Sequence, residues 1–455
     1  MLALSKTHLR VVGIASILLG ATQSSPTASA TCIAVGLILS LWSLWTQLPL
    51  LVGSEHRWAA VASAALMVVA FGRLIPTLPG SMLNSRPIIL VSSAVMCSLA
   101  FLAGDRRWGR RIVSVLAISL TVTTLVVLMA QEWSSPVGSD VYHAHQLAGD
   151  AVRSGLNPYT DAVTFTNGNP FAPPDSVIQG YPYPPVALSA YGIAGAFTDP
   201  RLISAVCWFA FLGWLAFGAW RTDSNADSRI KLSVLMLMAL TPLGYQVWFM
   251  AWTEPLTLFL FLVAALTWKR SPLWSGVLLG LALASKQYLI FLLPLVLVHR
   301  DPGWRTRSTA AVAASGLTLI AGLVPNPTAF VEATLGNLTS IGFRPDTQSL
   351  PGLANGLGFT FLLPNWLWIL LSVAAVTVLA RSSRTRSDFM LRAGLGLGIA
   401  FLFGLAFRNY WFLVAGLLAI GTVLETADVG VTHLGQDEKV DSAQGRRQET
   451  RIAGV

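Results

Sequence analysis

Long runs of apolar residues, separated by short polar stretches, make up most of the chain. A run of about twenty apolar residues is long enough to cross the hydrocarbon core of a bilayer as an α-helix. The predicted fold is an all-α, polytopic transmembrane helix bundle of about 12–14 spans. We place the spans at 9–23, 31–52, 58–79, 87–104, 112–131, 202–220, 231–251, 255–268, 271–285, 286–299, 309–325, 361–380, 389–407 and 410–424.

Two polar segments interrupt this pattern, at 132–185 and 326–360. The first is rich in proline, glycine and asparagine, which favour turns, and it also contains a helical pattern near its start. We therefore predict a large extracytoplasmic loop that carries short helices. The apolar stretch Val186–Phe197 follows this loop and is too short to cross the bilayer. It is predicted to lie at the surface or to enter and leave on the same side.

These segments divide the chain into three parts. Residues 1–111 form additional N-terminal helices, residues 112–425 form a core that carries both outer loops, and residues 426–455 form a polar cytoplasmic tail. The first thirty residues have two interpretations. Lys6 and Arg10 precede an apolar run, and Ala28-Ser29-Ala30 is similar to a signal-peptidase site. Residues 1–30 are therefore either a cleaved signal segment or a short first span.

Composition and charge support a membrane protein. Hydrophobic residues make up 54% of the chain and charged residues 11%, whereas soluble proteins carry roughly a quarter charged residues. The net charge of +9 arises mainly from short basic connections between spans, which is the positive-inside pattern and not a nucleic-acid surface. This pattern predicts cytoplasmic N- and C-termini. The three cysteines lie in separate apolar runs and offer neither a zinc site nor an evident disulfide.

The same topology places several polar segments together on the outer face of the membrane. They supply a carboxylate for acid–base chemistry, cations for phosphate, and aromatic and amide groups for sugars. Asp140, just beyond the 112–131 span, is the candidate catalytic base. The candidate donor-phosphate ligands are Lys286, Arg408 and Arg344. The candidate sugar- or acceptor-binding residues are Tyr142, His143, Asn157, Tyr159, Tyr183, Glu254, Gln287, Asp346, Gln348 and Tyr410.

Each of these residues also has a purely structural interpretation. Asp140 precedes a helical pattern and is suited to cap it. Lys286 and Arg408 stand at helix ends, where long basic side chains commonly extend to the interface. His143 and His145 are two residues apart and therefore point to different sides of a helix, which disfavours a metal pair. The common location on one membrane face favours a functional site, and no metal is predicted.

Three groups of motifs resemble the GT-C superfamily of polytopic glycosyltransferases. Asp140-x-Tyr142, Gly155–Tyr159 and Tyr183-Pro184-Pro185 are similar to its first outer loop. The segment Gly280–Lys286 is similar to a helix-pair segment ending in lysine, and Asp346–Gly352 to a late outer loop that often reads N-Q-S-L-x-G. Asp346 departs from that pattern. The resemblance covers 112–425 and is closest to bacterial polyprenol-phosphate-mannose-dependent α-mannosyltransferases.

The resemblance implies a glycosyltransferase of the cell membrane with its active site on the extracytoplasmic face. The donor would be a polyprenyl-phosphate sugar, with mannose as the leading candidate for the sugar. The acceptor would be a glycolipid or glycan. Asp140 would be the base of an inverting displacement, and neither a cofactor nor a divalent metal is required because basic residues can stabilise the leaving phosphate. A transporter or flippase is the alternative, and an oligosaccharide ligase is a third option. A transporter predicts ionisable residues midway along the spans, whereas a ligase predicts a larger late loop.

Overall fold

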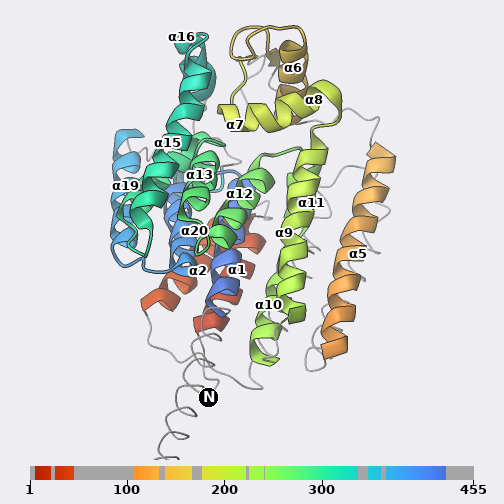
Figure 1. Cartoon of the computed structure of the whole chain (residues 1–455), viewed down its shortest axis with the longest axis vertical. Helices are drawn as coiled ribbons and strands as arrows, with labels where there is room; N and C mark the ends of the chain where they lie inside the picture. The colour runs from red at the N-terminus through yellow and green to blue at the C-terminus, as the bar shows by residue number, and fades with distance from the viewer. Residues whose placement is uncertain are drawn as a thin grey trace, which may run out of the picture.

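The computed structural model describes residues 6–21, 26–45, 107–132, 139–166, 177–221, 225–239, 241–336, 347–359 and 365–426. These residues form a bundle of helices with one small antiparallel sheet of two strands, which confirms the predicted all-α helical membrane bundle (Figure 1). The predicted spans at 58–79 and 87–104 and most of the polar tail lie outside the described residues, as do Arg344 and Asp346.

The helices of the bundle largely coincide with the predicted apolar runs. A final helix, Arg408–Thr426, completes the described chain. The others are α1 (Lys6–Ala21), α2 (Pro26–Trp45), α5 (Arg107–Glu132), α9 (Arg201–Arg221), α10 (Asn225–Ala239), α11 (Pro242–Phe249), α12 (Glu254–Thr267), α13 (Pro272–Leu283), η4 (Gln287–Leu292), α14 (Leu293–Val298), α15 (Trp304–Leu323), α19 (Asn365–Arg381) and α20 (Arg386–Phe403).

The shorter elements come from the polar segments of the sequence. The first segment gives α6 (Asp140–Arg153), β1 (Thr164–Thr166) and β2 (Val177–Gln179), followed by α7 (Pro185–Ala187), η3 (Leu188–Gly192) and α8 (Ile193–Phe197). The late segment gives α16 (Pro327–Val331), η5 (Glu332–Gly336) and α18 (Leu350–Gly356). Figure 1 shows α6, α7, α8 and α16 gathered at one end of the bundle, which we call the loop end. The run α7–η3–α8 lies across this end (Figure 1), and whether it lies at the membrane surface stays a prediction.

The predicted span 231–251 is wrong as a continuous helix. α10 ends at Ala239 and α11 begins at Pro242, with Thr241 as its N-cap residue. Proline lacks the backbone N–H of a helix interior but is well suited to the first helical position. The apolar pattern did not reveal this break because the residues on both sides of it are apolar.

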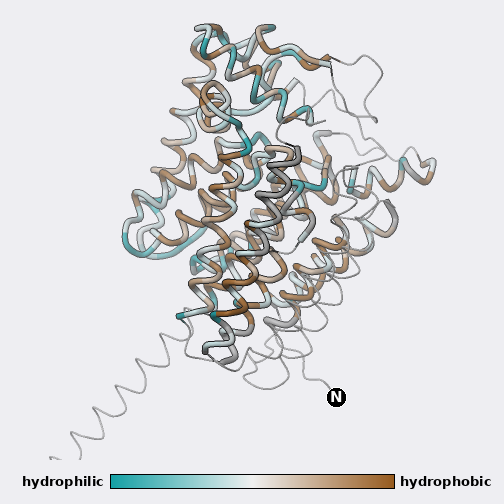
Figure 2. Tube along the Cα trace, turned by 90° about the vertical axis from the view of Figure 1, so that its right-hand side faces the viewer, coloured by the Kyte–Doolittle hydropathy of each residue, from teal (hydrophilic) through white to brown (hydrophobic). Residues whose placement is uncertain are grey.

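By length and composition, two described helices are able to cross a bilayer, Arg201–Arg221 and Arg408–Thr426. A third candidate is the pair Trp304–Leu323 and Pro327–Gly336, which is bent by 118° between its two parts. Eight shorter apolar stretches of 10–17 residues also lie in the described part of the chain. Figure 2 shows hydrophobic residues along the bundle and hydrophilic ones mainly toward its ends. The number of spans therefore stays a prediction.

The final helix, Arg408–Thr426, lies in the centre of the bundle, where neighbouring helices bury 94% of its most apolar stretch. Its Trp411 and Phe412 are fully buried, and the Phe412 ring packs against Trp208 of α9 with the ring centres 5.0 Å apart. α12 and α13 run antiparallel beside it and are joined at the end opposite the loop end. This hairpin returns the chain to the loop end, so that Glu254 at its start lies next to Lys286 after its finish.

Basic connections gather at the opposite end of the bundle. The Arg307 guanidinium donates to the Trp268 carbonyl over 3.0 Å, and Arg300 N donates to the Ser383 carbonyl over 3.4 Å. The basic connections at 269–270, 300–307 and 381–386 therefore lie together, away from α6. The N-terminal helices α1 and α2 pack into the same hydrophobic core as the rest of the bundle.

Candidate active site

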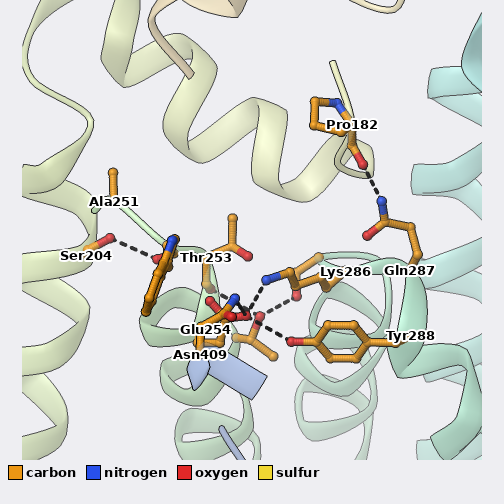
Figure 3. A network of polar contacts seen from close by, with 12 residues as sticks. Pro182, Ser204, Ala251, Thr253, Glu254, Lys286, Gln287, Tyr288 and Asn409 are labelled. Carbon is orange, nitrogen blue, oxygen red and sulfur yellow. Dashed lines mark hydrogen bonds and ion pairs between the residues drawn. The ribbon is translucent and has the colours of Figure 1, made fainter. Parts of the chain in front are cut away.

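A buried carboxylate forms the centre of the polar network at the loop end. Glu254 is the first residue of α12 and is fully buried. Its Oε1 accepts hydrogen bonds from the Lys286 ammonium, from the Tyr288 hydroxyl at 3.0 Å and from the Asn409 amide at 2.7 Å. Figure 3 shows these three side chains pointing toward Glu254. Within the described residues, Glu254 Oε2 has no hydrogen-bond partner.

Lys286 lies between this carboxylate and three aromatic rings. Its Nζ lies 5.1 Å from the ring centre of Tyr410, 5.4 Å from that of Tyr288 and 5.5 Å from that of Tyr183. Ammonium groups are attracted to ring faces at such distances. We call Lys286 with these three rings the lysine cage. Lys286 itself has extended backbone (φ −153°, ψ 142°) between α13 and η4, and this break in the helix directs its side chain into the cage.

The structural interpretation of Lys286 as an interfacial lysine is wrong. Its side chain is only 3% exposed and forms a buried ion pair with Glu254. Burial of two charges is costly unless they are paired and further hydrogen-bonded, and Tyr288 and Asn409 supply those further bonds to the carboxylate. The predicted donor-phosphate ligand therefore already has an anionic partner inside the protein.

Asp140 is the first residue of α6, and the helix cap is its neighbour. Ser139 is the N-cap, and its hydroxyl accepts from Tyr142 N at 3.4 Å, so the interpretation of Asp140 as the cap is wrong. The half-buried Asp140 carboxylate accepts from Val141 N at 2.9 Å. Its charge also acts on Lys286 and on Tyr183, which places Asp140 at the edge of the lysine cage.

Two carboxylates thus act on the same tyrosine. Burial raises the pKa of the Tyr183 phenol well above its usual value, and the charges of Asp140 and Glu254 raise it further. Tyr183 therefore stays protonated and keeps a hydroxyl able to donate a hydrogen bond. The structure brings together Asp140, Glu254, Lys286, Tyr183 and Tyr410, which the sequence places in four separate segments.

Several predicted sugar-binding residues make contacts that hold the loop end together. Tyr142 is buried and its hydroxyl donates to Asp199 over 3.3 Å. The Asn157 side chain accepts from Tyr159 N at 3.0 Å, and the Tyr159 hydroxyl donates to the Tyr183 carbonyl over 3.2 Å. These contacts fold the first polar segment onto itself.

Two predicted glutamines join distant segments. The Gln287 amide donates to the Pro182 carbonyl and, over 3.1 Å, to the Thr334 carbonyl. The buried Gln348 amide donates to the Ala21 carbonyl over 3.0 Å. Of the remaining predicted residues, His143 is half-buried with its ring edge-on to Tyr142, and Arg408 is half-buried at the start of the final helix.

The sequence did not single out two buried groups beside the site. Asp199 and Arg201 form a buried ion pair, and the guanidinium lies 5.2 Å from the Tyr142 ring centre. The motif Asp-Pro-Arg at the start of α9 was the available signal, since an acidic residue two positions before a helical arginine is well placed for such a contact. Asn409 lies between the predicted residues Arg408 and Tyr410 and was not itself predicted, yet its amide donates to Glu254.

His145, on the buried side of α6, is a further buried group that the predicted site residues did not include. Its Nε2 lies 3.1 Å from the Ala251 carbonyl, and its Nδ1 lies 2.8 Å from the Tyr181 hydroxyl. Burial lowers the pKa of His145 from 6.5 to about 3, so the imidazole is neutral. Within the described ranges, no group of three or more His, Cys, Asp or Glu side chains is arranged to hold a metal ion.

Comparison with known proteins identifies one family. The profile of glycosyltransferase family 87 matches residues 181–408, which is half of the chain. The matched region begins at the tyrosines of the first polar segment, contains Glu254 and Lys286, and ends at the start of the final helix. No curated protein and no solved structure matches the chain significantly.

Proposed function

Because the chain belongs to glycosyltransferase family 87 and is a membrane glycosyltransferase, we propose that it transfers mannose from a polyprenyl-phosphate donor. The acceptor is a glycolipid or glycan on the extracytoplasmic face of the cell membrane. The observation that carries this proposal is the pair of carboxylates at the lysine cage, one fully buried and one half-buried. The basic connections at the opposite end of the bundle support an outward-facing loop end.

The two carboxylates are suited to different tasks. Glu254 is fully buried, and its Oε1 is bound by three donors, so it holds the site in place. Asp140 is half-buried at the start of α6 and is reached more easily by a substrate hydroxyl. Asp140 is therefore the base that takes the proton from the acceptor hydroxyl, and such a base typically contributes 10²–10⁴-fold to the rate, as an order of magnitude.

The displacement requires positive charge where the donor's phosphate departs. The acceptor oxygen bonds to the anomeric carbon while the bond from that carbon to the phosphate oxygen breaks, which inverts the configuration. The phosphate then carries the additional negative charge, and cations aimed at that charge stabilise the transition state. Arg408, Arg344 and Lys286 supply these cations, and Lys286 acts from within its cage. This arrangement requires neither a cofactor nor a divalent metal.

The tyrosines and amides of the site complete the proposal. Tyr183 and Tyr410 offer ring faces for the C–H surface of a sugar, and Tyr183 also keeps a donor hydroxyl. His143, Asp346 and Asn157 remain candidates for hydrogen bonds with the acceptor. Tyr142, Tyr159, Gln287 and Gln348 contribute by holding the segments that carry these groups.

The test compares two aspartates of the same helix. Membranes containing wild type, Asp140→Asn or Asp150→Asn are supplied with radiolabelled polyprenyl-phosphate mannose and a lipid extract. Asp150 is exposed and pairs with Arg153, so its variant controls for charge removal on α6. We expect Asp140→Asn to lower transfer by about 10²-fold or more, and Asp150→Asn to retain it. Equal transfer by Asp140→Asn and wild type would remove Asp140 from the chemistry.

A further inference from the structure

The turn that precedes Glu254 has an unusual backbone. Ala251 has φ of 53° and is the one non-glycine residue with positive φ in the described part of the chain. Residues with a Cβ are rarely found in this region, because the side chain crowds the backbone. Such a conformation persists where the surroundings impose it. Ala251 is fully buried, three residues before the carboxylate at the centre of the site.

His145 of α6 holds this turn at its strained residue. A carbonyl oxygen only accepts, so His145 Nε2 carries the proton and donates to the Ala251 carbonyl over 3.1 Å. Nδ1 is then the acceptor for the Tyr181 hydroxyl at 2.8 Å. The imidazole is fully buried and stacks on Tyr191, with the ring centres 4.5 Å apart and the planes 13° apart.

The carbonyls on either side of Ala251 also accept hydrogen bonds from side chains. The Ser139 hydroxyl, next to Asp140, donates to the Met250 carbonyl over 3.2 Å. The hydroxyls of Tyr191 and Ser204 lie 3.2 and 3.1 Å from the Trp252 carbonyl. Three consecutive carbonyls thus accept bonds from the N-cap residue of α6 and from side chains of α6, η3 and α9. Figure 3 shows Ser204 and Ala251 beside Thr253 and Glu254.

We propose that His145 is a positioning residue that locks the Ala251 turn and thereby fixes Glu254, with its bound lysine, relative to Asp140. Asp140 and His145 lie on the same helix, and the lock joins that helix directly to the turn from which α12 begins. The catalytic consequence rests on the proposed function, whereas the lock itself is a statement about the backbone. His145 acts through Ala251 and does not contact the substrate.

The experiment combines removal of the lock with relief of the strain. His145→Phe keeps an aromatic ring but loses both hydrogen bonds, and Ala251→Gly allows positive φ without crowding. Each variant and the double variant are placed in lipid nanodiscs. Hydrogen–deuterium exchange is measured for the backbone amides of 250–254, and kcat and KM are measured for mannose transfer.

We expect His145→Phe to speed exchange at 250–254 and to lower kcat by roughly tenfold or more, because small misplacements of reacting groups are costly. KM should change much less. In the Ala251→Gly background, His145→Phe should lose only about threefold in kcat, since glycine holds the turn without strain. His299→Phe is the matched control, because His299 is a buried histidine at the opposite end, bonded to Ser383. It should leave exchange at 250–254 and kcat unchanged.

Unchanged exchange at 250–254 in His145→Phe would overturn the proposal, as would an equal loss of kcat in both backgrounds. If His145→Phe is not recovered folded, Ser204→Ala removes one bond to the same turn, and the same comparison applies. A wild-type protein that transfers no mannose would contradict the proposed function instead. The exchange of His145→Phe with and without Ala251→Gly would still decide whether the lock exists.

Discussion

Replacing Glu254 with glutamine tests whether the buried ion pair is arranged as described. The substitution removes the charge but keeps the shape, so the Lys286 ammonium loses its anionic partner while it stays 3% exposed. Leaving one member of a buried pair without its partner costs about 3–5 kcal/mol. The amide oxygen of glutamine can take the place of Oε1 and accept from Lys286, Tyr288 and Asn409, so the loss reports the missing charge.

The double variant Glu254→Gln with Lys286→Met separates the charge from the packing. Methionine is close to lysine in length and carries no charge, so it fits the same three rings. Apolar replacements of a buried pair are often neutral or stabilising. We therefore expect the double variant to be more stable than Glu254→Gln alone, by about 2 kcal/mol or more.

The assay is reversible unfolding in detergent micelles, with the free energy of unfolding measured for wild type, Glu254→Gln, Lys286→Met and the double variant. The exposed pair Arg153–Asp150 is the control, since exposed pairs contribute about 0–1 kcal/mol. A loss of unfolding free energy below about 1 kcal/mol for Glu254→Gln would mean that this pair contributes no more than an exposed pair does. A double variant that loses the sum of both single losses would show that the two charges do not interact. Either result would refute the buried-pair reasoning.

Two further predictions concern pH and helix packing. The pKa of His145 is lowered to about 3 in the folded protein from 6.5, so its contribution to stability is complete above pH 6.5 and is lost as the pH falls. Between pH 6.5 and 5, wild type should lose about 2 kcal/mol more unfolding free energy than His145→Gln, and parallel pH profiles of the two would contradict this. Gly280→Ala should lower the melting temperature through a loss of about 1–3 kcal/mol, because the added Cβ would lie 2.4 Å from the Ala311 carbonyl oxygen of α15. An unchanged melting temperature would show that α13 and α15 separate freely.

The sequence predicted the helices better than the contacts between them. Apolar runs located α12, α13 and the proline-punctuated η4–α14 segment, because helix formation and burial depend on local composition. The same runs missed the break before Pro242, since the residues on both sides of the break are apolar and the pattern does not change there. The sequence also predicted that the charged side chains of the loop end share one face of the membrane, but it did not predict which of them are in contact.

The pairing of these charges could not be predicted from the sequence. Glu254 and Lys286 are 32 residues apart, and Asn409 lies 155 residues from Glu254. Their contact depends on the return of the α12–α13 hairpin to the loop end and on the central position of the final helix. The strained Ala251 was invisible for another reason, since alanine carries no sequence signal for positive φ.

The contact between Arg10 and Glu425 has a consequence for the biosynthesis of the protein. Arg10 of α1 is buried, its guanidinium pairs with Glu425 near the end of the final helix, and it also donates to the Ser43 hydroxyl over 3.0 Å. The two partners are 415 residues apart, so about 20–80 s of translation separate their appearance. The buried Arg10 therefore gains this anionic partner only after the helix that carries Glu425 has been made, whereas the Ser43 hydroxyl is available from early in synthesis.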